Sequence, residues 1–122
     1  MGAIRVLLVD DADEVRRDLC TLLSLSEGLV VVGEASNGSE AVCQIGALQP
    51  DVVLMDLEMP VMDGYESTRQ IKTCFPSCKV IALTVHDYEA ARLKAKQSGV
   101  DAFLVKGAPI ESIILTIQKR KE

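Results

Sequence analysis

The chain has 122 residues, 48% of them hydrophobic and 25% charged, so it can fold as one domain around its own apolar core without a metal or a disulfide. Its net charge of -5 and its 3% of aromatic residues, with no tryptophan, argue against direct binding of nucleic acid by this domain. Only a handful of apolar residues precede Asp10, so the N-terminus is neither a signal peptide nor a membrane span, and we expect a cytoplasmic protein with no membrane contact.

The four cysteines include no CxxC pair, and the single histidine lies outside any spacing typical of metal ligands. We therefore expect thiols buried in the core, rather than a metal site, at Cys20, Cys43, Cys74 and Cys78. Oxidation could join Cys74 to Cys78, and such a bond would be an accident of handling rather than a switch.

The N-terminal half alternates short apolar runs with segments of helical period. Runs 4–9, 29–32 and 52–55 are rich in β-branched residues, which predicts strands that are covered on both faces. Apolar residues three and four positions apart predict one amphipathic helix in each of the first two intervals, at Val15, Leu19, Leu22 and Leu23 and at Ala41, Ile45 and Leu48. Asn37 and Glu40 are typical of a capping box at the start of the second helix.

The C-terminal half continues this alternation. Asp63 can cap a third helix with a weaker apolar face, and runs 80–83 and 102–105 predict two more strands. Segment 87–97 has only a small apolar face, which indicates a mobile or partner-facing helix that ends at Gly99. The last helix holds its period most clearly, with Pro109 in its first turn and Ile110, Ile113, Ile114 and Ile117 on one face. Because right-handed crossovers leave few other arrangements, strictly alternating strands and helices predict a doubly wound α/β fold with a parallel sheet.

Polar residues end four of the five predicted strands. Asp10 and Asp11 follow the first, Asp56 the third, Thr84 the fourth and Lys106 the fifth. Any one of them could be an ordinary cap or loop residue. Ligands of doubly wound folds gather at the carboxyl ends of the strands, so we expect all five side chains to meet at one edge of the sheet.

Three clustered carboxylates repel one another unless a cation lies among them. A small set of oxygen ligands suits Mg²⁺, which keeps several waters and takes its remaining ligands from a substrate phosphate. The amine of Lys106 and the hydroxyl of Thr84 could then bind the oxygens of a transferred phosphoryl group. The acceptor in such a site would be a carboxylate.

Taken together, these motifs resemble the receiver domain of two-component response regulators. The resemblance covers essentially all 122 residues and rests on Asp10-Asp11, on DLEMPVMDG beginning at Asp56, on Thr84, and on FLVKGAP with Lys106. It implies a flavodoxin-like three-layer sandwich with strand order 2-1-3-4-5 and a single receiver domain over residues 1–122, with no second domain. The stretch GVDAFLVKGA is similar to receivers of the nitrate-regulator type, which precede a helix-turn-helix output domain.

The resemblance also implies roles for the matching residues. Asp56 would accept a phosphoryl group from a histidine kinase or phosphotransfer protein, and Lys106 would hold that group. Asp11 and Asp56 would bind Mg²⁺ through their side chains and Glu58 through its backbone carbonyl, while Asp10 would support the ion through water. The domain would catalyse only its own phosphoryl transfer and dephosphorylation, so it would not be an enzyme acting on other substrates.

Thr84 would swing inward to bond the phosphoryl group, and Phe103 matches the switch aromatic that turns from exposed to buried with it. A plain core phenylalanine is the other interpretation of Phe103. The resemblance further implies that phosphorylation changes a partner-binding face formed by the fourth helix, fifth strand and fifth helix. Dimerisation on phosphorylation and control of transcription through an output domain would follow from that change.

Three positions vary within the family or depart from its pattern. Glu58 and His86 stand two residues after Asp56 and Thr84, where side chains tend to tune hydrolysis of the acyl phosphate, although His86 also fits a solvated loop. Gly107 follows the lysine where many receivers have a proline joined by a cis bond, which leaves the isomer of the Lys106–Gly107 bond open.

Two other functions remain as hypotheses. Aspartyl-phosphate chemistry also serves haloacid-dehalogenase-like phosphatases, but those enzymes usually carry a second aspartate where Glu58 stands here, together with a cap domain. A receiver scaffold can also bind partners independently of phosphorylation. Intact Asp11, Asp56, Thr84 and Lys106 argue against a degenerate site without excluding constitutive binding.

Overall fold

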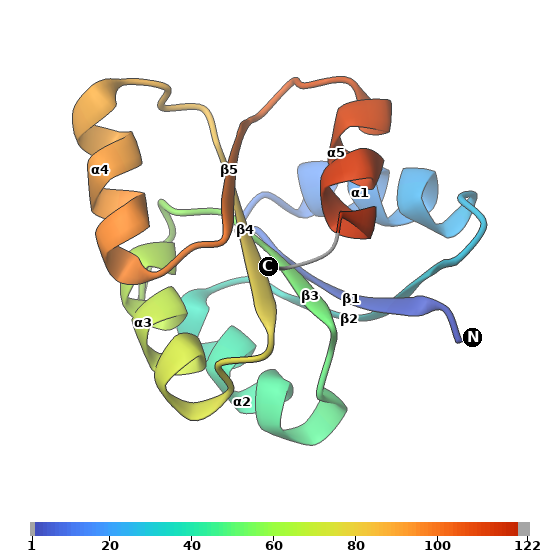
Figure 1. The fold of residues 1–122 in the computed structure, drawn as a ribbon, viewed down its shortest axis with the longest axis horizontal. Helices are drawn as coiled ribbons and strands as arrows, with labels where there is room; N and C mark the ends of the chain where they lie inside the picture. The colour runs from blue at the N-terminus through green and yellow to red at the C-terminus, as the bar shows by residue number, and fades with distance from the viewer. Residues whose placement is uncertain (1, 120–122) are drawn as a thin grey trace.

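The computed structural model describes residues 2–119, in which five strands and five helices alternate along the chain. In order they are β1 (Ile4–Val9), α1 (Asp13–Ser24), β2 (Leu29–Ala35), α2 (Gly38–Leu48), β3 (Val52–Met55), α3 (Gly64–Cys74), β4 (Lys79–Thr84), α4 (Glu89–Ser98), β5 (Ala102–Val105) and α5 (Ile110–Gln118). The sheet is parallel throughout, in the order β2-β1-β3-β4-β5. Figure 1 shows α1 and α5 on one face of the sheet and α2, α3 and α4 on the other. The predicted doubly wound, flavodoxin-like three-layer fold is confirmed.

The core has two apolar clusters, one on each face of the sheet, because successive side chains of a strand point to opposite faces. The cluster beneath α2, α3 and α4 takes from the strands Leu7, Val9, Val53, Met55, Val80 and Ala82. The cluster beneath α1 and α5 takes Val6, Leu8, Leu29, Val52, Leu54 and Ile81. All four residues of β3 are buried, which explains why its sequence is apolar at every position up to Asp56.

The helix ends follow the predicted signals, with two differences. The side chains of Asn37 and Asp63 accept hydrogen bonds from backbone N–H groups three residues on, each at 2.9 Å, and Gly99 ends α4 in the left-handed conformation. In a capping box, the carboxylate of Glu40 would accept a hydrogen bond from the backbone N–H of Asn37. Here it accepts instead from the backbone N–H of Ser36, one residue earlier, at 2.9 Å. Pro109 is the N-cap of α5 rather than a residue of its first turn, and its carbonyl accepts the first helical hydrogen bonds.

Two strands are longer than the sequence predicted. β2 continues through Gly33 to Ala35 because these residues pair with β1. A Cβ at Gly33 would lie 2.6 Å from Cδ1 of Leu48, so glycine lets α2 lie close to the strand. β4 begins at Lys79, whose buried amine donates to the carbonyls of Thr116 (2.5 Å) and Lys119 (2.6 Å) at the end of α5. Backbone pairing and tertiary contacts, rather than the apolar pattern, set these boundaries.

The expectation that the cysteines are buried was wrong for two of the four. Cys43 and Cys74 are exposed because they lie on the outward faces of α2 and α3, Cys20 is half-buried, and Cys78 is buried. The peptide bond between Lys106 and Gly107 is trans, and Gly107 has a φ of 91°, which glycine adopts without strain.

The small apolar face predicted for the fourth helix is present in α4. Its buried residues are Ala91, Ala95 and Ser98, whereas Leu93 is exposed. Between residues 2 and 119, none of the helices is both long enough and apolar enough to cross a bilayer.

Candidate functional site

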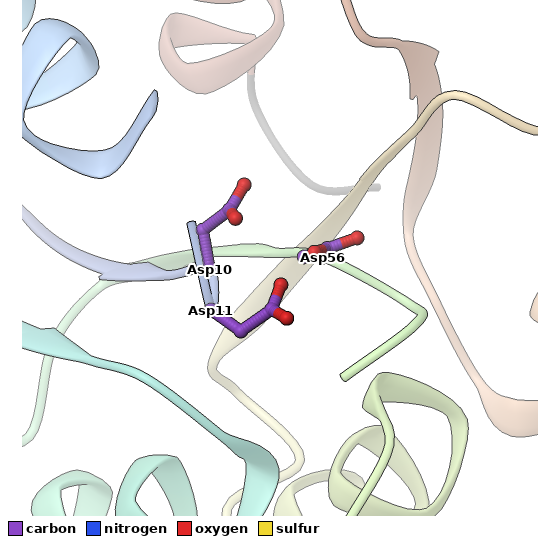
Figure 2. A group of neighbouring side chains, drawn as sticks. All are labelled: Asp10, Asp11 and Asp56. Atoms are coloured by element: carbon purple, nitrogen blue, oxygen red, sulfur yellow. The ribbon is translucent and has the colours of Figure 1, made fainter. Parts of the chain in front are cut away.

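Three carboxylates meet beyond the carboxyl ends of β1 and β3. Figure 2 shows Asp10 and Asp11, from the loop after β1, next to Asp56, which follows β3. Each contributes one oxygen to a group whose members all lie within 4.8 Å of one another. Asp10 and Asp56 are only 3% and 5% exposed, whereas Asp11 is exposed. The cluster therefore has a buried side and an open side.

Lys106 brings a cation to the buried side of this cluster. Its amine lies 2.8 Å from Oδ2 of Asp10 and 3.3 Å from Oδ2 of Asp56. The backbone N–H of Lys106 donates to the carbonyl of Thr84 at 2.7 Å. This hydrogen bond joins the ends of β4 and β5. The structure thus brings together four of the residues that sequence analysis assigned to one edge of the sheet.

The loop after Asp56 folds tightly against that residue. The backbone N–H of Asp56 donates to the carbonyl of Val9 at 2.9 Å, and the N–H of Gly64 returns to the carbonyl of Leu57 at 3.0 Å. A Cβ at Gly64 would overlap the carbonyl oxygen of Asp56, so no other residue fits without a shift of the loop. Glu58 lies in this loop, and its backbone N–H makes a long contact of 3.4 Å with Oδ1 of Asp56. The glycine therefore keeps the loop close to the acid.

Burial raises the pKa of Asp56 from its ordinary value of 3.8 to about 6; Asp10 adds to this increase, and Lys106 opposes it. Burial also acts to lower the pKa of Lys106, but its bond to Asp10 and the charge of Asp56 outweigh this effect, so that the pKa rises. The lysine stays protonated beside two acids and an exposed third one. This set of oxygen donors, with an excess of negative charge, fits a hard divalent cation such as Mg²⁺.

Thr84 and Phe103 lie on β4 and β5, the two strands that follow β3 in the sheet. Thr84 is 1% exposed at the end of β4, and its hydroxyl accepts a hydrogen bond from the backbone N–H of His86 at 3.2 Å. Phe103, on β5, is half-buried, and the guanidinium of Arg92 lies 4.6 Å from the centre of its ring. The ring is therefore neither a fully enclosed core residue nor an open surface residue.

Two contacts at the site had no signal in the sequence. Nε2 of His86 lies 3.1 Å from Oε2 of Glu58, so the two partly exposed side chains connect the loops that follow β3 and β4. Spacing shows that each stands two residues after a site residue, but it does not show that they meet. Arg16 of α1 donates to the backbone carbonyl of Asp10 at 2.6 Å. In the sequence Arg16 is one of several charged residues on the polar side of an amphipathic helix.

Comparison with known proteins identifies the family. The chain matches the response regulator receiver domain family over residues 6–118. It is 39% identical over 115 residues to the response regulator GacA of Pseudomonas viridiflava, a match that covers 94% of this chain and 54% of that protein. It is also 39% identical over 114 residues to the transcriptional regulatory protein LnrK of Bacillus subtilis, covering 93% of this chain and 52% of LnrK. The chain belongs to the receiver domain family of response regulators, and it spans about half the length of these relatives.

The similar solved structures include a receiver of the NarL type. The signal receiver domain of NarL from Mycobacterium tuberculosis has a TM-score of 0.90 and 31% identity with this chain, over 98% of this chain and 100% of that one. The homologues therefore include receivers of the NarL type, which agrees with the resemblance to the nitrate-regulator type seen in the sequence.

Proposed function

We propose that the protein is a phosphorylation-activated switch of a two-component system, in which residues 1–122 act as one receiver domain and Asp56 is the phosphoacceptor. The observation that carries this proposal is the placement of the Lys106 amine against both Asp10 and Asp56, with the exposed Asp11 carboxylate beside them. The buried carboxylate of Asp56 thus has the Lys106 amine on one side and the exposed Asp11 carboxylate on the other. This arrangement is suited to a phosphoryl group.

In the proposed reaction, a carboxylate oxygen of Asp56 attacks the phosphorus of a phosphohistidine on a kinase or phosphotransfer protein. The new O–P bond forms as the N–P bond breaks, and the leaving imidazole takes up a proton. Above its raised pKa of about 6 the Asp56 carboxyl is ionised and can act as the nucleophile. Lys106, already within 3.3 Å, would offset the charge that develops on the phosphoryl oxygens.

The acids fit Mg²⁺ in the manner that the receiver family implies. The side chains of Asp11 and Asp56 and the backbone carbonyl of Glu58 would hold the ion, with Asp10 supporting it through water. Bound there, Mg²⁺ supplies positive charge that lets the acids and a phosphoryl group share one site. The depth of Asp10 and the exposure of Asp11 agree with an indirect role for the first and a direct role for the second.

Thr84 and Phe103 are the proposed switch pair. The hydroxyl of Thr84 accepts one hydrogen bond and keeps its own hydrogen free to donate, so a phosphoryl oxygen can draw it inward. Phe103 is half-buried on β5 and could complete its burial when Thr84 moves. The face made by α4, β5 and α5 would then change shape for a partner or a second copy of the chain.

The names and lengths of the relatives support a proposed biological setting. LnrK is named as a transcriptional regulatory protein, and both it and GacA are about twice as long as this chain. We propose that the domain acts in the cytoplasm, where a histidine kinase would phosphorylate it and an output domain would bind DNA. In this role the domain acts on no substrate other than its own phosphoryl group.

Mass spectrometry after incubation with acetyl phosphate and Mg²⁺ tests the proposal. The parent protein should gain one phosphoryl mass, Asp56→Asn should gain none, and Asp18→Asn, a change on the exposed face of α1, should behave as the parent. A parent protein whose mass stays the same would overturn the proposal. Steady, Asp56-dependent turnover of a phosphomonoester would instead favour a phosphatase.

A further inference from the structure

Arg16 of α1 makes three hydrogen bonds around the loop that carries the acids. Its side chain is 14% exposed. It donates to the backbone carbonyl of Asp10 at 2.6 Å, to Oε1 of Glu34 at 3.0 Å and to Oδ1 of Asp13 at 2.7 Å. Arg17, the next residue, is exposed. One of two adjacent arginines is therefore tied to the site, and the other faces solvent.

These bonds complete the restraint of the backbone at Asp10. The N–H of Asp10 donates to the carbonyl of Ala35 at 3.0 Å, and its Oδ1 accepts from the N–H of Ala12 at 2.9 Å. The bond from Arg16 holds the remaining backbone polar group of Asp10, its carbonyl. Because a guanidinium is planar and presents its N–H groups in a fixed fork, it sets direction as well as distance. The position of Asp11, between Asp10 and Ala12, is thereby fixed on both sides.

Arg16 also closes the space behind the acids. It lines, together with Asp10, Asp56 and five apolar side chains, an internal cavity of about 10 Å³. A void of this size is at the lower limit for a single water molecule. The space between Arg16 and the two buried acids is therefore nearly filled by side chains.

The charge of Arg16 does not by itself explain its place. Asp13 and Glu34 both form ion pairs with the guanidinium, so two carboxylates outside the cluster already match its positive charge. The bond to the Asp10 carbonyl is a contact with the backbone of the acidic loop. Position and charge can therefore be tested separately.

We propose that Arg16 is a positioning residue for the cation site: by holding the carbonyl of Asp10, it sets the β1–α1 loop so that Asp10 and Asp11 present oxygens alongside Asp56. It acts through this loop and touches neither the metal nor the phosphoryl group. This inference rests on the proposed function of the acidic cluster as a divalent-cation site.

The test measures Mn²⁺ affinity of the whole chain by electron paramagnetic resonance, with thermal unfolding to check that each variant is folded. Arg16→Met removes all three bonds and should weaken Mn²⁺ binding roughly tenfold, the scale expected for one charge-assisted hydrogen bond. Arg16→Lys should fall between Arg16→Met and the parent. Arg17→Met, which removes the same charge from the same helix, and Glu34→Gln, which keeps an acceptor for Arg16, should each stay within about twofold.

Two further readouts separate positioning from a general loss of structure. Amide exchange of Ala12 in the metal-free protein should be faster in Arg16→Met than in Arg17→Met, because the loop is released. Labelling by acetyl phosphate should return to near the parent rate when Mg²⁺ saturates Arg16→Met. Parent-like Mn²⁺ affinity in Arg16→Met, or an equal loss in Arg17→Met, would overturn the inference.

Two other results are also decisive. If Arg16→Met does not fold, Arg16→Lys decides the question, and unchanged affinity in that variant would also count against positioning. If the parent binds Mn²⁺ but takes no label from acetyl phosphate, the proposed function fails, whereas the affinity series still supports the role of Arg16.

Discussion

The amine of Lys106, at the end of β5, lies 3.3 Å from Oδ2 of Asp56, at the end of β3, although β4 stands between these strands in the sheet. The lysine therefore reaches across a strand to the proposed phosphoacceptor. Its charge lowers the pKa of Asp56 against the effect of burial, and it is the only lysine that the structure places against the acids within residues 2–119.

Lys106→Met should slow phosphorylation of Asp56 by acetyl phosphate by about 10- to 1000-fold, because one preorganised positive partner of the phosphoryl oxygens is lost. It should also raise the pKa of Asp56 in the metal-free protein, as followed by carbon NMR of the carboxyl group. Lys96→Met removes an exposed lysine of α4 and should change neither quantity. A parent-like labelling rate in Lys106→Met would contradict the role given to this lysine.

Asp56→Asn should stabilise the metal-free protein at neutral pH. The folded-state pKa of Asp56, about 6, exceeds the ordinary 3.8, so the fold favours the neutral acid. The contribution of this group to stability is therefore greatest below pH 3.8 and is lost as the pH rises through 6. The difference of about two units sets an upper limit of about 3 kcal/mol on the gain in the free energy of unfolding.

Urea unfolding of parent and Asp56→Asn between pH 4 and pH 8, in the presence of a chelator, measures this effect. The difference in unfolding free energy should grow with pH and nearly vanish at pH 4. If the difference in unfolding free energy does not vary with pH, burial does not raise the pKa of Asp56. Excess Mg²⁺ should stabilise the parent more than the variant, because the variant loses a carboxylate ligand.

The pair formed by Glu58 and His86 should affect the phosphoryl group more than the fold. Both side chains are well exposed, at 54% and 41%, so a double-mutant cycle should give a coupling below about 1 kcal/mol. Because the pair joins the loop that carries Asp56 to the loop after β4, breaking it with Glu58→Ala should admit water and speed loss of the phosphoryl group several-fold. Decay of the phosphorylated mass after removal of acetyl phosphate measures this rate, and His86→Ala should act in the same direction.

Gly64→Ala should destabilise the protein by about 1 to 3 kcal/mol, because its Cβ would overlap the carbonyl of Asp56 and push the loop outward. Gly46→Ala in α2 is the matched control: its Cβ would meet only Cζ of Phe75, at 3.9 Å, which is ordinary contact. There the substitution should be neutral or stabilising by up to about 1 kcal/mol, as expected for alanine in a helix. If both substitutions change the free energy of unfolding in urea equally, the close approach of the Asp56 carbonyl to Gly64 does not destabilise the alanine variant.

The strands and the polar residues at their ends could be predicted because both signals are local. Asp56 follows a run that is apolar at every position, and the alternation of strands with helices then fixes the side of the sheet on which it emerges. The extension of β2 could not be predicted, because Gly33 looks like a turn residue until Leu48 is seen against it. Contacts such as that between Glu58 and His86 depend on where two loops meet.

The cysteines and Arg16 show the same limit at the level of single side chains. Composition places cysteine among the buried residue types, but the helical faces of α2 and α3 turn Cys43 and Cys74 outward. Arg16 and Arg17 are identical in type and adjacent in sequence, yet only the first turns toward the acidic loop. A helix turns by about 100° per residue. An error of one residue in the predicted orientation of α1 would therefore point Arg17, rather than Arg16, toward the acidic loop.

The shallow anchoring of α4 has a consequence for motion. The helix gives the core only the methyl groups of Ala91 and Ala95 and the small side chain of Ser98. At about 0.8 kcal/mol for each buried methylene-sized group, little apolar free energy is lost if it lifts or slides. Local opening of α4 is therefore expected at a small fraction of the free energy of global unfolding. Under the proposed function, phosphorylation of Asp56 would then need only a small difference in free energy between the two positions of α4 to shift its population.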